Sequence, residues 1–221
     1  HFACAGGSLE VATYIIRNLT PELKKNLNLA PEQSWATPLF LATHSKSIDI
    51  LRLLFENGAE ISQNHSFHKT PLIEAIENKD LDCFLEIFNH SKLEGQGDND
   101  DSPLMKALSM NSLVAARFLV ENGADVNYRT SENKNALFIA CFTKNAEMVR
   151  FLLENGADVN KRGFLGTFPI HHAAMSDNVE IVKMVINAGA DPKATDTNGI
   201  PPTFSALCSV NNRYEIISLL F

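Results

Sequence analysis

The stretch Leu153-Glu154-Asn155-Gly156-Ala157-Asp158 has close copies elsewhere in the chain. These copies are Leu54-Phe55-Glu56-Asn57-Gly58-Ala59-Glu60, Leu119-Val120-Glu121-Asn122-Gly123-Ala124-Asp125 and Ile186-Asn187-Ala188-Gly189-Ala190-Asp191. The glycines at 123, 156 and 189 are 33 residues apart. A fixed period of this length indicates a repeat architecture in which each unit is one supersecondary element.

A second mark has the same period. Its positions are Pro38, Pro71, Pro103, Ala136, Pro169 and Pro202, separated by 33, 32, 33, 33 and 33 residues. Thr37, Thr70 and Ser102 come directly before a proline. A hydroxyl caps the free N–H groups of a helix start, and proline at the first helical position loses no hydrogen bond. These positions therefore predict helix starts.

Each unit is predicted to hold two helices. A short first helix follows the proline mark, for example over residues 39–46 or 137–143. The second carries an apolar stripe at helical spacing, as in Met148 to Leu153 with Arg150 left for solvent. Gly156 and its equivalents end this helix in the left-handed conformation. One such pair cannot bury its own apolar face, so neighbouring units must stack.

The segment Phe168-Pro169-Ile170-His171-His172-Ala173-Ala174, followed by Ala190-Asp191, resembles the T-P-L-H-x-A-A and G-A-D-V-N pattern of the ankyrin repeat. The resemblance covers the whole chain. It implies an all-α, curved solenoid of antiparallel helix pairs with hairpin-like connectors at one edge. It also implies that His171 and His1, which share a register, are structural histidines that tie neighbouring backbone together.

The register divides residues 1–221 into a single array of seven units. Their approximate ranges are 1–31, 32–64, 65–96, 97–129, 130–162, 163–195 and 196–221. Neither end reads as a polar capping unit, so the sequence is expected to be a segment of a longer protein. Residues 18–32 hold extra residues, which favour either an added helical turn at Thr20-Pro21 or a longer connector. The acidic stretch 91–101 predicts a mobile loop, and a calcium loop is the alternative.

The composition excludes several classes of protein. Hydrophobic residues make up 45% and charged residues 20%, which is typical of a folded chain. The net charge is -7, and no Lys/Arg cluster is present that would bind nucleic acid. There is no apolar run long enough for membrane insertion. The four cysteines lack metal spacing and are expected to be reduced, mostly packed thiols of an intracellular, cytoplasmic protein.

No sequence motif for catalysis is found. The chain is therefore predicted to be no enzyme, with no metal, no cofactor and no small-molecule substrate. His171-His172 is a poor metal pair, because adjacent helical residues point about 100° apart. Asn127 and Asn160 resemble sites of asparaginyl hydroxylation in the ankyrin family, and the alternative is that they hydrogen-bond the turn.

The predicted function is a protein–protein interaction module that binds a partner protein or peptide on its concave face. The alternatives are a targeting arm of a larger enzyme and a structural spacer. We expect a monomer unless exposed ends self-associate. The residues predicted to contact the partner are Met110, Phe142, Met175, Phe164 and Leu165, with Ser109, Thr143 and Ser176 as a polar rim and Phe67 at another connector tip. These apolar side chains could instead fold back against the neighbouring unit.

Overall fold

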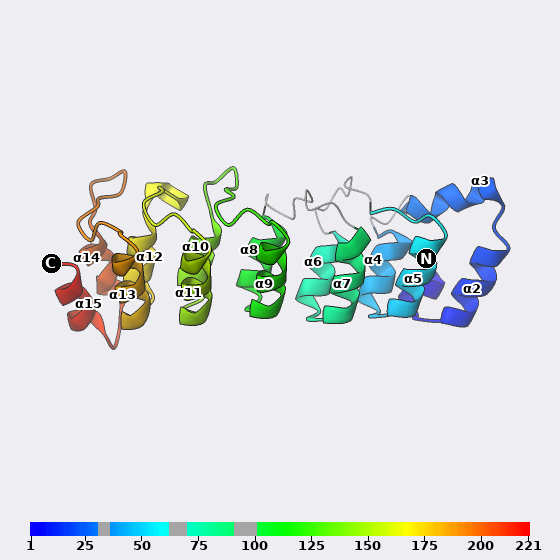
Figure 1. The fold of residues 1–221 in the computed structure, drawn as a ribbon, viewed down its shortest axis with the longest axis horizontal. Helices are drawn as coiled ribbons and strands as arrows, with labels where there is room; N and C mark the ends of the chain where they lie inside the picture. Colours follow the sequence, from blue (N-terminus) through cyan, green and yellow to red (C-terminus); the bar gives the residue numbers. More distant parts are fainter. Residues whose placement is uncertain (31–35, 62–69, 91–100) are drawn as a thin grey trace. The chain divides into compact units, whose positions relative to one another are not determined.

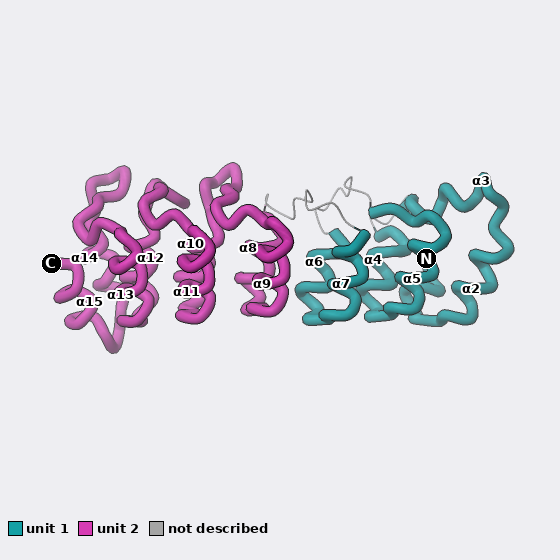
Figure 2. The backbone as a smooth tube through the Cα atoms, in the orientation of Figure 1, with its two compact units in different colours: residues 1–99 teal, residues 100–221 magenta. Residues whose placement is uncertain are grey.

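The computed structural model describes residues 1–30, 36–61, 70–90 and 101–221. Every regular element within these residues is a helix (Figure 1), which confirms the all-α fold class. The chain forms two compact units, residues 1–99 and 100–221 (Figure 2). The seven repeat boundaries and the single array stay predictions.

Unit 1 consists of antiparallel helix pairs. Helix α4 contacts both α5 and α6, and α5 contacts α7, so each pair packs on the next. Helix α5 contributes Ile50, Leu51 and Leu54 to the core of unit 1, where all three are fully buried. The elements are α1 (Phe2–Ala5), α2 (Leu9–Arg17), α3 (Pro21–Lys24), η1 (Lys25–Asn28), α4 (Pro38–His44), α5 (Ile48–Glu56), α6 (Pro71–Glu77) and α7 (Leu81–His90).

Unit 2 repeats the same arrangement. Helix α10 contacts α8, α11 and α12, and α11 contacts α13. First helices therefore lie against first helices and second helices against second helices. The elements are α8 (Pro103–Ser109), α9 (Leu113–Glu121), α10 (Ala136–Phe142), α11 (Ala146–Glu154), η3 (Phe164–Gly166), α12 (Pro169–Met175), α13 (Val179–Asn187), α14 (Pro202–Ser205), η4 (Ala206–Cys208) and α15 (Arg213–Leu219).

The predicted helix starts and ends are confirmed. The six positions of the proline mark are the first residues of α4, α6, α8, α10, α12 and α14. The side chain of Thr37 accepts a hydrogen bond from the N–H of Phe40, and Thr70 and Ser102 cap in the same way. The glycines after α5, α9, α11 and α13 all have positive φ, between 84° at Gly156 and 95° at Gly189.

The extra residues near the N-terminus form helical structure. Thr20 caps α3 by accepting a hydrogen bond from the N–H of Leu23, and η1 continues directly from α3. Of the two predictions for this segment, the added helical turn at Thr20-Pro21 is confirmed. The predictions for residues 91–100 and Phe67 lie outside the described residues.

The turn between the two helices of each repeat has an unexpected composition. Its central residue is left-handed in successive repeats, but it is not glycine after the first repeat. The residues are Lys46, Lys79, Asn111, Lys144 and Asp177, with φ between 54° and 59°. This conformation costs free energy for residues other than glycine. The stacking of the units therefore holds these turns in place against their local preference.

The connectors join successive units through asparagine side chains. Asn127 donates to the carbonyl of Gly156 at 2.9 Å and accepts from the N–H of Asp158 at 2.9 Å. Asn160 donates to the carbonyl of Gly189 at 3.1 Å. Both side chains are thus engaged in backbone hydrogen bonds, which supports the turn-bonding alternative for these two residues.

Replacement of Gly156 by valine tests the helix end. No heavy atom lies within 4 Å of a Cβ built at this glycine, so the cost would come from its φ of +84° alone. We expect Gly156→Val to lower the free energy of unfolding by about 1–3 kcal/mol in urea denaturation. The exposed Glu154→Ala is the control and should change it by about 0.5 kcal/mol or less. Equal midpoints for the two variants would contradict the assignment.

Candidate partner-binding surface

Two of the exposed apolar side chains of unit 2 lie at the ends of neighbouring first helices. Phe142 is the last residue of α10, and Met175 is the last residue of α12. Phe142 is 71% exposed and Met175 is 42% exposed. Because α10 and α12 contact each other, these two side chains occupy equivalent positions on adjacent helices. Exposure of such residues side by side marks a candidate interaction site.

An aromatic cluster lies beside these two residues. The ring of Phe138 stacks on Phe142 with centroids 6.2 Å apart, one helical turn away. Phe138 also meets Phe164 at 5.7 Å and the edge of His172 at 4.5 Å. Phe138 therefore joins α10 to α12 and to the connector that contains η3. We call Phe142, Phe164, Leu165 and Met175 the Phe142 surface, with Phe138 and His172 as its support.

Hydrogen bonds fix the connector against α12. The hydroxyl of Thr167 donates to the carbonyl of Phe164 at 2.6 Å, so its oxygen accepts from Nε2 of His172 at 2.6 Å. Burial, with a smaller effect of His171, lowers the pKa of His172 to about 4. His172 is therefore neutral near pH 7 and acts as a hydrogen-bond donor and an aromatic wall.

Leu165 is held in a conformation that leucine rarely adopts. Its φ is +54° and its ψ is 24°, yet its side chain is 72% exposed. The hydroxyl of Thr197 in the next connector donates to its carbonyl at 3.4 Å. A large apolar side chain that is both strained and exposed has no packing role in the unit itself. The turn residues Lys46 and Lys144 have a similar φ, so the feature that distinguishes Leu165 is its large exposed apolar side chain.

The predicted site residues differ in their positions. Ser109 and Thr143 are accessible, although each hydroxyl donates to its own helix. Met110 is the C-cap of α8 and is partly buried. It lies one residue beyond the position of Phe142 and Met175, which Ser109 occupies. Met110 therefore does not continue the row predicted from sequence.

Ser176 is not part of the rim. It is only 3% exposed, its hydroxyl donates to the carbonyl of Ala173, and its oxygen accepts from the N–H of Asn178. The prediction failed because Ser176 folds into the turn of its own unit. Two supporting residues were missed, Phe138 and His172. Phe138 occupies the register position of His171, but so do Phe40, Ile73, Met105 and Phe204, so the sequence alone did not single it out.

The hydrogen bonds of His171 confirm the structural role that was predicted for it. Its Nδ1 accepts from the N–H of Phe168 at 3.2 Å, so Nε2 carries the proton and donates to the carbonyl of Ile200 at 3.0 Å. His1 makes the equivalent bond from Nε2 to the carbonyl of Leu29 at 2.8 Å. Both rings tie a first helix to the following connector.

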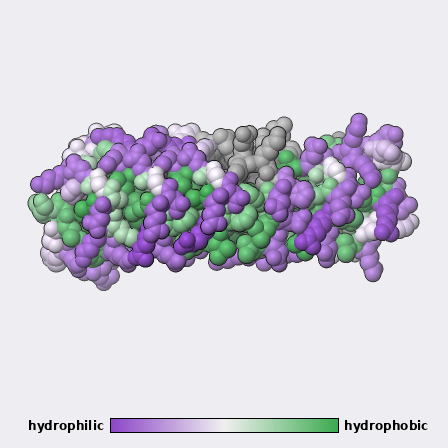
Figure 3. Space-filling model, viewed as in Figure 1, coloured by the Kyte–Doolittle hydropathy of each residue, from purple (hydrophilic) through white to green (hydrophobic). Residues whose placement is uncertain are grey.

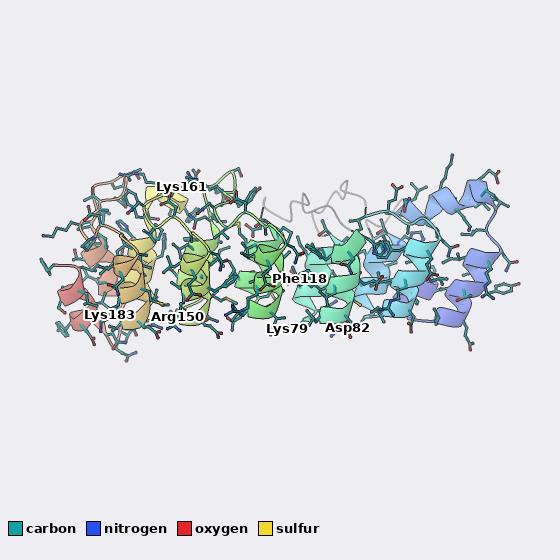
Figure 4. The ribbon with its side chains drawn as sticks, viewed as in Figure 1. Lys79, Asp82, Phe118, Arg150, Lys161 and Lys183 are labelled. Atoms are coloured by element: carbon teal, nitrogen blue, oxygen red, sulfur yellow. The ribbon has the colours of Figure 1, made fainter. Side chains whose placement is uncertain are left out.

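The second helices of unit 2 carry a different kind of surface. Ion pairs link successive helices there: Arg117 with Glu147, Arg150 with Glu180, and Lys183 with Glu215. Arg150 and Lys183 lie at the same edge on neighbouring helices (Figure 4). In the view of Figure 3, hydrophilic side chains lie between hydrophobic ones over this unit. The charged second helices contrast with the aromatic ends of the first helices.

Among the described residues, no group of three or more His, Cys, Asp or Glu could hold a metal ion. None of the described helices has the length and hydropathy of a bilayer-spanning segment. The four cysteines are free; Cys4, Cys83 and Cys141 are buried and Cys208 is exposed. Burial raises the pKa of Cys141 to about 12, which makes its thiol unreactive.

Comparison with known families agrees with this geometry. One family model, described as ankyrin repeats in three copies, matches residues 72–163, and another for ankyrin repeats in many copies matches residues 145–186. The chain belongs to the ankyrin repeat family. Domains of this family are in general protein–protein interaction modules built on a non-catalytic fold.

Solved structures show the same fold. The ankyrin repeat domain of Bcl-3 is 21% identical, with a TM-score of 0.82 over 100% of this chain and 96% of that one. The human ASB11 ankyrin repeat domain is 23% identical, with a TM-score of 0.81 over 99% of this chain and 96% of that one.

Curated relatives match by sequence at lower coverage. The ankyrin repeat and KH domain-containing protein mask-1 of Caenorhabditis elegans is 29% identical over 66% of this chain and 5% of its own length. A putative ankyrin repeat protein of fowlpox virus is 26% identical over 67% of this chain and 19% of its own length. The chain thus spans less than a fifth of either relative.

His172→Gln tests the support of the surface through pH. The unfolded chain binds a proton near the ordinary histidine pKa of about 6.5, whereas the folded chain binds it at about 4. The free energy of unfolding should therefore fall as the pH is lowered from about 6.5 towards 4, and this part of the fall is about 1–3 kcal/mol. Glutamine keeps an N–H for Thr167 but does not titrate, so the variant should lose less stability in urea denaturation across this range. Identical pH dependence in both proteins would show that His172 is not held neutral.

Proposed function

We propose that this chain is a protein–protein interaction module whose partner docks on the Phe142 surface of unit 2. This surface lies at the ends of the first helices and on the connector before α12, the side that the resemblance implies to be concave. The observation that carries the proposal is the exposure of Phe142, Leu165 and Met175 together on two adjacent repeats of unit 2. Aromatic residues and methionine are enriched at the centres of protein interfaces.

The surface is prepared for binding before a partner arrives. Phe138 holds Phe142 and Phe164 by ring contacts, and the hydrogen bonds from His172 through Thr167 fix the connector. A rigid surface loses little conformational entropy when it binds, so more of the contact energy appears as affinity. The strained backbone of Leu165 presents its side chain at a fixed place on this surface.

A polar rim borders the apolar centre. Ser109 and Thr143 are accessible, and their oxygens keep lone pairs that can accept hydrogen bonds from a partner. An apolar centre with a polar border is the usual anatomy of a protein interface. Helix α12 contains no hydroxyl side chain, so it has no residue that takes the place of the buried Ser176 in the rim.

Phe142→Ala is the direct test. The side chain lies at the centre of the surface, so truncation should weaken partner binding by about 2 kcal/mol, or roughly 30-fold. Proteins captured from cell extract by the wild-type chain are quantified by mass spectrometry against those captured by the variant. Val114→Ala is the matched control, because Val114 is an exposed apolar residue on the second helix α9.

The proposal expects proteins that are retained by the wild type and by Val114→Ala and are depleted at least about tenfold by Phe142→Ala. Equal thermal midpoints of the two variants show that folding is not the cause. If every retained protein binds all three forms equally, the partner does not use the Phe142 surface.

A further inference from the structure

The charge around the Phe142 surface is opposite to the charge of the chain. The connectors and first helices that form it span residues 122–142 and 155–175. These segments contain four of the chain's 19 basic residues, Arg129, Lys134, Lys161 and Arg162, and three of its 26 acidic residues, Asp125, Glu132 and Asp158. The whole chain has a net charge of -7. These segments therefore carry a small excess of positive charge on an acidic protein.

The positive charge is confined to these two units. The corresponding segments elsewhere carry no excess of basic residues. They are residues 29–44, 57–77, 91–109 and 188–208. The charge thus varies with the apolar surface rather than with the repeat, and this joint occurrence points to one ligand.

The cations lie next to the aromatic rings. Nζ of Lys134 is 5.2 Å from the centre of the Phe164 ring and 2.7 Å from the carboxylate of Glu132. Arg162 lies over the Phe168 ring at 4.6 Å and donates to the carbonyl of Gly166 at 2.9 Å. Arg129 donates to the carbonyl of Arg162 at 2.6 Å. The guanidinium groups are thereby held in place on the connector, with further N–H groups left to donate.

Lys161 of this set and one further lysine, Lys144, mark the extent of this region. Lys161 lies on the connector edge of unit 2, at the opposite edge from Arg150 and Lys183 (Figure 4). Lys144 follows α10 and is exposed. The equivalent residue after α12 is Asp177, whose carboxylate accepts from Ser209, Asn211 and Asn212. These hydrogen bonds lower the pKa of Asp177, so it stays charged, and its carboxylate is engaged by the following repeat.

We propose that the partner is an acidic peptide segment in which Asp or Glu alternates with bulky apolar side chains. The inference rests on the proposed function, since it assigns the chemistry of the partner at the same surface. The apolar side chains would contact Phe142, Leu165 and Met175, while the carboxylates would pair with Lys161, Arg162 and Lys144. Complementary charge of this kind sets specificity and speeds association.

A protein segment fits better than a nucleic acid. The exposed groups of the surface centre are aliphatic and phenyl side chains, and the rest of the chain is strongly acidic and would repel a long polyanion. A short acidic segment with apolar anchors avoids both problems. It needs only a few carboxylates, and it buries the exposed Phe142 and Leu165.

The test is selection from displayed random peptides of about 12 residues, long enough when extended to cross two units. Peptides selected on the wild-type chain are sequenced, and a labelled copy of the consensus is titrated by fluorescence anisotropy. We expect a negative net charge with two or more aromatic or large aliphatic residues. Raising the salt from about 50 to 300 mM should weaken binding several-fold.

Charge reversal then locates the contact. Lys161→Glu and Lys144→Glu should each weaken the consensus peptide on the order of tenfold. Lys79→Glu is the matched control, because Lys79 is exposed, lies in unit 1 and has the same left-handed turn conformation as Lys144. It changes the net charge of the chain equally and should leave the affinity unchanged.

The outcomes separate this inference from the proposed function. Neutral or basic peptides that lose binding in Phe142→Ala would overturn the acidic partner but keep the surface. Acidic peptides that Lys79→Glu weakens as much as Lys161→Glu would show a response to net charge alone and would overturn the local contact. If no peptide is enriched, the peptide inference is wrong, and selected peptides that ignore Phe142→Ala would overturn the surface as well.

Discussion

Burial of apolar helix faces between neighbouring repeats is the constraint on which the rest of the structure depends. A pair of short helices has an apolar face on each side, and it can remove those faces from water only by stacking on neighbours. The fully buried residues show this, because Leu54 in α5 and Leu152 in α11 each lie in a second helix that contacts another second helix. Polar ties reinforce the stacking at the connector edge, as in the bonds of Asn127 and His171 to the following unit. The spacing of 33 residues follows from this need for identical neighbours.

The same constraint explains how much the sequence could predict. Helix starts and ends depend on local backbone chemistry, so Thr37, Ser102 and Gly156 identified them correctly. Side-chain exposure depends on what the next unit places nearby. The sequence predicted the exposed Phe142 and Leu165 correctly, but it misjudged Ser176, whose hydroxyl bonds within the turn of its own repeat.

The misplacement of Met110 has a related cause. The helix starts at Pro103 and Ala136 fix the register, and counting from them assigns Ser109 rather than Met110 to the position of Phe142. A shift of one residue on a helix rotates a side chain by about 100°, enough to move it off a surface. Similarity of residue type was a weaker guide here than distance from the helix start. Local chemistry therefore predicted the frame of the repeat, and only the packed structure showed which side chains share a face.

One substitution connects the frame to the candidate surface. In the unit of His171, the imidazole ties α12 to the carbonyl of Ile200 in the following connector. Phe138 stands at the same position one unit earlier, and a phenyl ring cannot donate this bond. The connector there is held by ring contact of Phe138 with Phe164, and by the bond from His172 to Thr167. An aromatic contact thus stands in α10 where α12 has a polar tie, and it places Phe142 and Phe164 against a common ring. Of the six helices that begin at the proline mark, α12 alone has a histidine at this position, because Phe40, Ile73, Met105 and Phe204 occupy it in α4, α6, α8 and α14. Stacking of the repeats maintains the fold without that histidine, so the position in α10 can hold a ring that supports a binding surface.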